Sequence, residues 1–78
     1  PVTSIRYALP KSSDVTLRIL DISGREVQTI VSTSQSAGYY EVQWDGTDAL
    51  GETVSTGMYF AYLKAGEFST VIKMVSLR

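Results

Sequence analysis

The sequence lacks two residue types on which much protein chemistry depends. None of its 78 residues is a cysteine or a histidine. Without cysteine the chain forms no disulfide bond and no thiolate metal site. Without histidine it lacks the commonest general base and the commonest neutral metal ligand. These absences argue against an enzyme, and we expect no catalytic, metal-binding or cofactor-binding residues.

A strong charge of one sign and a long apolar run are also missing. The chain has 7 basic and 8 acidic side chains, a balance that does not favour a nucleic-acid partner. Its apolar runs are far shorter than a transmembrane segment, and its first residues show no signal-peptide pattern. A chain of this length forms one small domain, here residues 1–78, with little room for a deep catalytic cleft.

One catalytic arrangement remains open on residue types alone. Lys11 could form a Ser-Lys pair with Ser12 or Ser13. The segment "PKSSD" lies between two strand-like runs, however, and its composition is typical of a turn. We therefore interpret these residues as a turn.

Apolar residues recur with a period of two, which predicts strands. The alternation is clear in "SIRYALP", "DVTLRIL", "EVQTIV", "YYEVQWD", "MYFAYLKA" and "STVIKMVSL", and "TVSTG" is a short edge-like piece. Turn signals separate these runs, and "STSQSAG", residues 32–38, is predicted to be a surface loop. About seven short antiparallel strands at this spacing predict an all-β sandwich.

A sandwich needs one apolar face on each sheet, and the alternation assigns the residues that supply it. The predicted core consists of Ile5, Leu9, Val15, Leu17, Ile19, Val27, Val42, Trp44, Tyr59, Leu63, Ile72 and Met74. Outward-facing positions of one strand carry large side chains as well. Met58, Phe60 and Tyr62 should form an exposed patch flanked by Val71, Lys73 and Val75, a candidate docking surface.

The stretch "WDGTDALGETVSTGMYF", residues 44–60, resembles a functional site more than any other. Trp44 fits a core position at a strand end, and it also fits a sugar-stacking platform. Asp45, Asp48 and Glu52 offer carboxylates to a hard cation, although their spacing is not that of an EF-hand. The same aspartates, with Gly46 and Gly51, fit a turn whose carboxylates bind nearby backbone amides. The sequence leaves open whether a cation binds between Asp45 and Glu52.

Several motifs together resemble a known family. "SIRYALP", "VTLRILDISGREV", "SAGYYEVQWDG", "STGMYFAYLKAG" and "KMVSLR" follow one another along the chain. In this order they are similar to the type A C-terminal sorting domain of proteins exported by the type IX secretion system, which is also called the Por secretion system. The related Ig-like domain of flagellar hook-capping proteins is similar too. Two departures are Ala61, where the family often has tyrosine, and a lead-in reduced to Pro1, which suggests that the domain was cut from a longer protein.

The resemblance implies an Ig-like or fibronectin III-like sandwich without catalysis. It implies a C-terminal module that directs export of a larger secreted protein through the periplasm to the cell surface or the medium. The expected partners are the secretion machinery and a covalently linked upstream cargo domain, and weak self-association is left open. Residues 44–51 would then be a structural turn. The sorting-signal candidates are Lys73, Met74, Val75, Ser76, Leu77 and Arg78.

Two alternatives from other classes remain. A carbohydrate-binding or adhesive accessory module would expose Trp44, Tyr39 or Tyr62 as a flat aromatic strip. A structural Ig-like spacer would carry no separable signal in its last strand. The identity of the cargo, the mode of surface attachment and the oligomeric state do not follow from the sequence.

Overall fold

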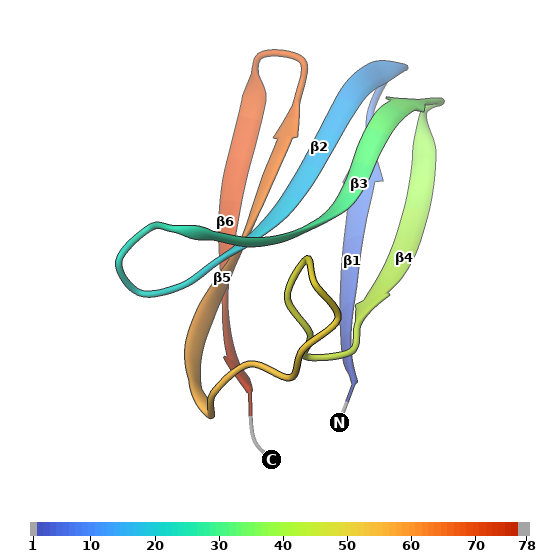
Figure 1. Ribbon diagram of the computed structural model, residues 1–78. Helices are drawn as coiled ribbons and strands as arrows, with labels where there is room; N and C mark the ends of the chain where they lie inside the picture. Colours follow the sequence, from blue (N-terminus) through green and yellow to red (C-terminus); the bar gives the residue numbers. More distant parts are fainter. Residues whose placement is uncertain (1, 77–78) are drawn as a thin grey trace.

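Six antiparallel strands make up the domain in a computed structural model that describes residues 2–76 (Figure 1). In chain order they are β1 (Thr3–Leu9), β2 (Ser13–Leu20), β3 (Glu26–Gln35), β4 (Gly38–Trp44), β5 (Gly57–Ala65) and β6 (Phe68–Ser76). The described residues contain no helix, and therefore no helix that could span a membrane. The predicted all-β class is confirmed.

The strands form two sheets whose apolar faces enclose one core. One sheet pairs β1 with β4, and the other has the order β3-β2-β5-β6. Alternation is clearest in β2 and β5, where every second residue is buried from Val15 to Ile19 and from Tyr59 to Ala65. The core consists of Ile5, Tyr7, Leu9, Val15, Leu17, Ile19, Val31, Trp44, Tyr59, Ala61, Leu63, Ala65 and Met74. Most of the predicted core is therefore correct, and Val27 and Val42 are partly buried against it.

The prediction of a buried Ile72 is wrong. Its partner across the strand pair, Ala61, is fully buried, so Ile72 lies on the inner face of the large sheet. Nevertheless 36% of Ile72 is exposed. The facing sheet has only two strands, and it leaves this part of the edge strand β6 uncovered. Two residues further along the same face, Met74 is 7% exposed and does reach the core.

Two segment predictions also need correction. The predicted loop at residues 32–38 is largely strand, because Ser32–Gln35 pair with β2. The predicted edge piece at residues 53–57 is not a strand, since Thr53 makes an isolated bridge with Thr47 and β5 begins at Gly57. The described part of the chain thus contains six strands rather than seven.

The different environments of Ile72 and Met74 give a testable difference in stability. Met74→Ala should lower the free energy of unfolding by about 2–5 kcal/mol, because it leaves a cavity in the core. Ile72→Thr should lower it by less than about 1 kcal/mol, since the side chain is already in contact with water. Chemical denaturation of both variants measures the difference. Equal losses would contradict the placement of Ile72 at an uncovered edge.

Candidate functional site

Trp44 is a core residue rather than a binding platform. It ends β4, and only 2% of it is exposed. Its ring meets Tyr59 edge-on, with centroids 5.3 Å apart and an interplanar angle of 63°. Its indole N–H donates a hydrogen bond to the Thr47 carbonyl oxygen at 2.8 Å. Both the apolar body and the polar group of the tryptophan are therefore engaged inside the protein.

The segment after Trp44 folds into a small hairpin of its own. Thr47 and Thr53 form a bridge, the Val54 amide donates to the Gly46 carbonyl at 2.9 Å, and the Asp48 amide donates to the Glu52 carbonyl at 2.8 Å. Gly46 and Gly51 have φ angles of 80° and 83°, a conformation that glycine adopts without strain. Figure 1 shows this yellow segment folding back at the end of the sandwich where both termini lie.

The hairpin is also attached to the large sheet. The Ala49 amide donates to the Val27 carbonyl at 3.0 Å, and the Gln28 side-chain amide donates to the Asp48 carbonyl at 2.8 Å. Val27 and Gln28 belong to β3. At the other end of the segment, the Tyr59 hydroxyl donates to the Ser55 carbonyl at 2.7 Å. The hairpin is thus fixed by contacts with β3, β4 and β5.

The aspartates of this hairpin bind backbone amides of their own turns. Asp45 Oδ1 accepts from the amide and the hydroxyl of Thr47, at 3.2 and 2.6 Å. The hydrogen bond from the Thr47 hydroxyl is the main cause that lowers the pKa of Asp45. Asp48 Oδ1 accepts from the amides of Leu50 and Glu52, at 2.9 and 3.0 Å. This arrangement supports the turn interpretation, because N–H and O–H donors of the turns already occupy Oδ1 of both aspartates.

Asp21 forms a similar turn between β2 and β3. Asp21 Oδ1 accepts from the amide of Ser23, the hydroxyl of Ser23 and the amide of Arg25, and Oδ2 accepts from Arg25 Nε at 3.2 Å. The Ser23 hydroxyl, followed by the Arg25 amide, lowers the pKa of Asp21 to about 2. In this turn, as in those at Asp45 and Asp48, an aspartate accepts a hydrogen bond from the backbone amide two residues further along the chain.

The two acidic turns face one shallow depression that the sequence analysis did not predict. Its volume is about 400 Å³, and Asp21, Arg25, Glu26, Val27, Asp48, Ala49, Leu50, Val54, Ser55 and Tyr59 line it. The residues come from segments that are distant in sequence, which is why no local motif indicated them. Among the described residues, no group of three or more acidic side chains is placed to hold a metal ion.

The Ser-Lys alternative finds no catalytic geometry. The Ser13 hydroxyl donates to the backbone carbonyl oxygen of Lys11 at 3.1 Å, in an exposed position. This is a contact within a turn, and it does not use the lysine amine. The turn prediction holds for residues 10–12 and is wrong for Ser13 and Asp14, which begin β2 and pair with Gln35 and Ser34.

Exposed aromatic residues do not form a flat strip. Tyr39 is 93% exposed on β4, whereas Tyr62 lies on β5 in the other sheet and is half-buried. Tyr7 and Tyr40 stack with their ring centroids 5.3 Å apart. Tyr7 is buried, which raises the pKa of its hydroxyl, and that hydroxyl donates a hydrogen bond to the Gln35 side-chain oxygen at 2.7 Å. This stacked pair therefore does not offer Tyr7 as an exposed platform. The carbohydrate alternative therefore lacks the aromatic surface that it requires.

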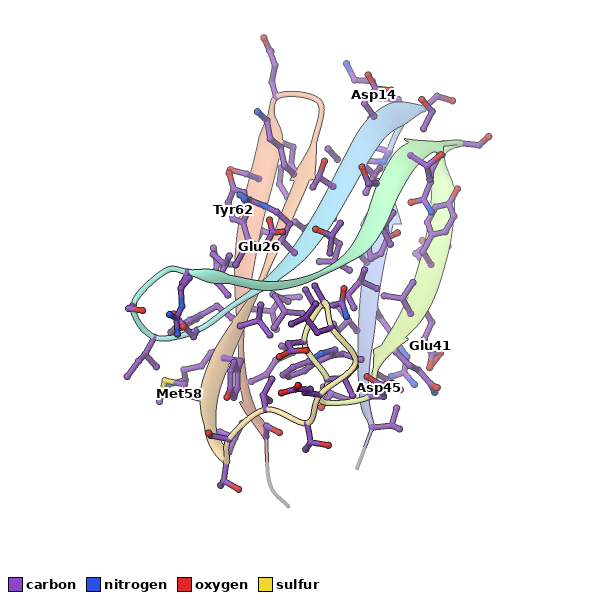
Figure 2. The ribbon with its side chains drawn as sticks, in the orientation of Figure 1. Asp14, Glu26, Glu41, Asp45, Met58 and Tyr62 are labelled. Atoms are coloured by element: carbon purple, nitrogen blue, oxygen red, sulfur yellow. The ribbon has the colours of Figure 1, made fainter. Side chains whose placement is uncertain are left out.

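The predicted docking patch lies on the outer face of the large sheet. Pairing of β5 with β6 places Met58 beside Val75, Phe60 beside Lys73 and Tyr62 beside Val71. Figure 2 shows Met58 and Tyr62 on the side of the sandwich opposite Glu41. The guanidinium of Arg18 lies 5.2 Å from the centroid of the Tyr62 ring. Nothing in the described residues covers Met58, Val71 or Val75, which are exposed.

Four of the six sorting-signal candidates, Lys73 to Ser76, lie in β6, and they divide into two groups. Lys73 and Val75 are exposed on the outer face, whereas Met74 and Ser76 are buried. Leu77 and Arg78 lie outside the described residues. A change at Lys73 or Val75 therefore alters the surface, while a change at Met74 or Ser76 also alters the core.

We expect calcium to leave the stability of the chain unchanged. The Oδ1 atoms of Asp45 and Asp48 already accept two hydrogen bonds each, and among the described residues no group of three or more acidic side chains is placed to hold a metal ion. Thermal melts with excess calcium or with chelator should coincide. A melting temperature that rises with calcium concentration would show linkage between binding and folding, and would restore the cation interpretation.

The turn at Asp21 predicts a specific response to acid. Its pKa is about 2 in the folded chain and roughly 3.9 in an unfolded one. The unfolded state therefore takes up a proton first, and the stabilisation present above pH 4 is lost as the pH falls towards 2. Asp21→Asn should flatten the loss of stability between pH 4 and pH 2. Identical pH profiles of the variant and the original chain would contradict the role of this carboxylate.

Comparison with known proteins agrees with the observed fold. The profile of the FlgD Ig-like domain matches residues 2–68, a match that ends where β6 begins. The crystal structure of FlgD from P. aeruginosa is similar, with a TM-score of 0.75 and 25% identity. The similarity covers 96% of this chain and 58% of that FlgD chain. A search of curated proteins gave no match. The FlgD Ig-like domain is a structural, non-enzymatic type of domain, and this chain belongs to the FlgD Ig-like domain family.

Proposed function

We propose that the chain is a non-catalytic Ig-like module that directs a larger secreted protein through the type IX secretion system to the cell surface. The observation that carries this proposal is the position of β6. It forms an edge of the large sheet, and it exposes Lys73 and Val75. An edge strand can be recognised by a partner that pairs with its free backbone groups.

The remainder of the domain serves as a scaffold for this strand. β6 pairs with β5 along its whole length, from Gly57 opposite Ser76 to Ala65 opposite Phe68. Only Met74 and Ser76 of β6 are buried. The strand is thus held in place by β5 alone, while most of its side chains remain accessible. This arrangement suits a sorting signal that the export machinery must recognise.

The proposal includes the partners and the location of the protein. The cargo is a domain covalently linked upstream of Pro1, and the recognising partners are components of the secretion machinery. The protein crosses the periplasm and then resides at the cell surface or outside the cell. The motifs that end in "KMVSLR" support this proposal by resemblance.

A structural spacer is the second candidate function. Membership of the FlgD Ig-like domain family favours it directly, as does the likeness to FlgD from P. aeruginosa. A spacer uses the same scaffold but carries no separable information in β6. The two candidates therefore differ in what happens when the surface of β6 is changed while the fold is kept.

The decisive variants change β6 without changing the core. Ser76 is buried, so it is unsuitable as a surface change. The double variant Lys73→Ala with Val75→Thr alters two exposed positions and should reduce surface delivery of the full-length protein. Lys73→Ala alone should weaken delivery less. Removal of residues 73–78 should abolish delivery, but this truncation also removes the buried Met74 and Ser76 and therefore does not separate the signal from the fold. Cell fractionation and surface labelling measure delivery.

The matched control is the double variant Lys11→Ala with Val2→Thr. Val2 and Val75 are similarly exposed, at 58% and 57%, and neither control position lies in β6. Unchanged melting temperatures for both double variants separate signalling from folding. Normal delivery of the β6 variant, together with periplasmic retention of a reporter fused to residues 1–78, would refute the export function and leave the spacer.

A further inference from the structure

The two edges of the large sheet are built differently. Along β3, the register with β2 shifts twice, between Leu17 and Arg18 and between Ile19 and Leu20. Such bulges twist an edge and hinder pairing with another strand. β6 pairs with β5 through nine consecutive residues without a shift. The edge at β6 is therefore regular, whereas the edge at β3 is interrupted.

Side chains strengthen this difference. The outward positions of β3 carry Thr29, Ser32 and Ser34, which are polar. β6 exposes apolar side chains on both of its faces, with Ile72 on the inner face and Val71 and Val75 on the outer face. Soluble proteins protect regular apolar edges, because such edges pair with other chains. The regular, apolar edge at β6 is suited to a partner strand.

Lys73 has two interpretations at this edge. A lysine on an edge strand hinders unwanted pairing, and that is its common structural role. However, Lys73 lies on the outer face between Val71 and Val75, and the inner face of β6 carries no charge between Thr70 and Ser76. The lysine therefore does not block pairing on the inner side. Its positive charge would favour an added strand that carries a carboxylate opposite it.

No ion pair of the described residues involves Lys73. The basic partners in those pairs are Arg6, Arg18 and Arg25, and Arg18 is held by Glu26 and lies over Tyr62. Across the strand pair, Lys73 faces Phe60, which has no charge. A residue opposite Lys73 on an added strand would have its Cβ about 5 Å away. A carboxylate at that position would lie close to the ammonium group of Lys73, which forms no ion pair within the described residues.

We propose that β6 docks a partner strand that is antiparallel to it, with a carboxylate opposite Lys73 and an apolar side chain opposite Ile72. The apolar residue extends the core past its uncovered edge, and further apolar residues face Val71 and Val75. Along the partner, the acidic residue directly precedes the apolar residue that faces Ile72. The inference rests on the proposed function, since it specifies the chemistry of the partner that recognises β6.

The test uses the whole chain and end-blocked synthetic peptides of seven residues. The first peptide has glutamate at the position that faces Lys73, valine opposite Val71, Ile72 and Val75, and threonine elsewhere. The second peptide replaces the glutamate by lysine, and the third replaces a central residue by proline, which cannot donate to a ladder. Titrations followed by amide chemical shifts report both the affinity and the strand that binds.

The glutamate peptide should perturb the amides of β6 and bind about two- to fivefold more tightly than the lysine peptide, the range that one exposed charge pair produces. Lys73→Glu should reverse this preference. Arg6→Glu makes the same change of charge on β1, in the other sheet, and should leave the preference unchanged. The proline peptide should not bind. Melting temperatures confirm that both variants are folded.

Three results would overturn the inference: no perturbation of β6 by either charged peptide, a preference that does not depend on Lys73, or binding at β3 instead. Delivery in cells separates this inference from the proposed function. If the glutamate peptide binds selectively but surface delivery does not change in the β6 variants, the export function is refuted and a strand contact in a spacer is supported. Delivery that depends on β6 without selectivity for the glutamate peptide would refute the strand chemistry alone.

Discussion

The structure depends on the side chain of Trp44. A domain of 78 residues without cysteine has no covalent cross-link to join its two sheets, so the junction must come from packing. Trp44 ends β4 in the small sheet and contacts Tyr59 in the large one. Its indole N–H also holds the Thr47 carbonyl. One residue thus closes the core and fixes the connection between the sheets.

Much of this fold could be predicted because alternation is a direct consequence of strand geometry. The buried positions of β1, β2 and β5 follow a period of two, which is visible in the sequence. Ser32–Gln35 gave no such signal, since their side chains are polar on both faces and only pairing with β2 makes them a strand. Ile72 was misassigned because periodicity identifies the face of a residue, while the width of the opposite sheet decides its burial.

The candidate site was predictable to a similar extent. Aspartate with a glycine nearby indicates a turn from local chemistry alone, and Asp45 and Asp48 each accept a hydrogen bond from the amide two residues on. The attachment of this hairpin to Val27 and Gln28 in β3 was not predictable, because it depends on contacts between distant segments. The unequal edges of the large sheet were hidden for the same reason. A bulge is a property of the pairing between two strands, and no single strand reveals it.

A packed sandwich whose large sheet has one regular edge, at β6, unites these features, whether the module serves export or spacing. Hydrogen exchange of the isolated chain tests this view most directly. The indole proton of Trp44 and the amides of β2, which has a strand on each side, should exchange only through global unfolding. The amides of β6 that point away from β5 should exchange far faster, by local exposure. Rapid exchange at the Trp44 indole, or uniform protection along β6, would contradict a fixed core with a free edge.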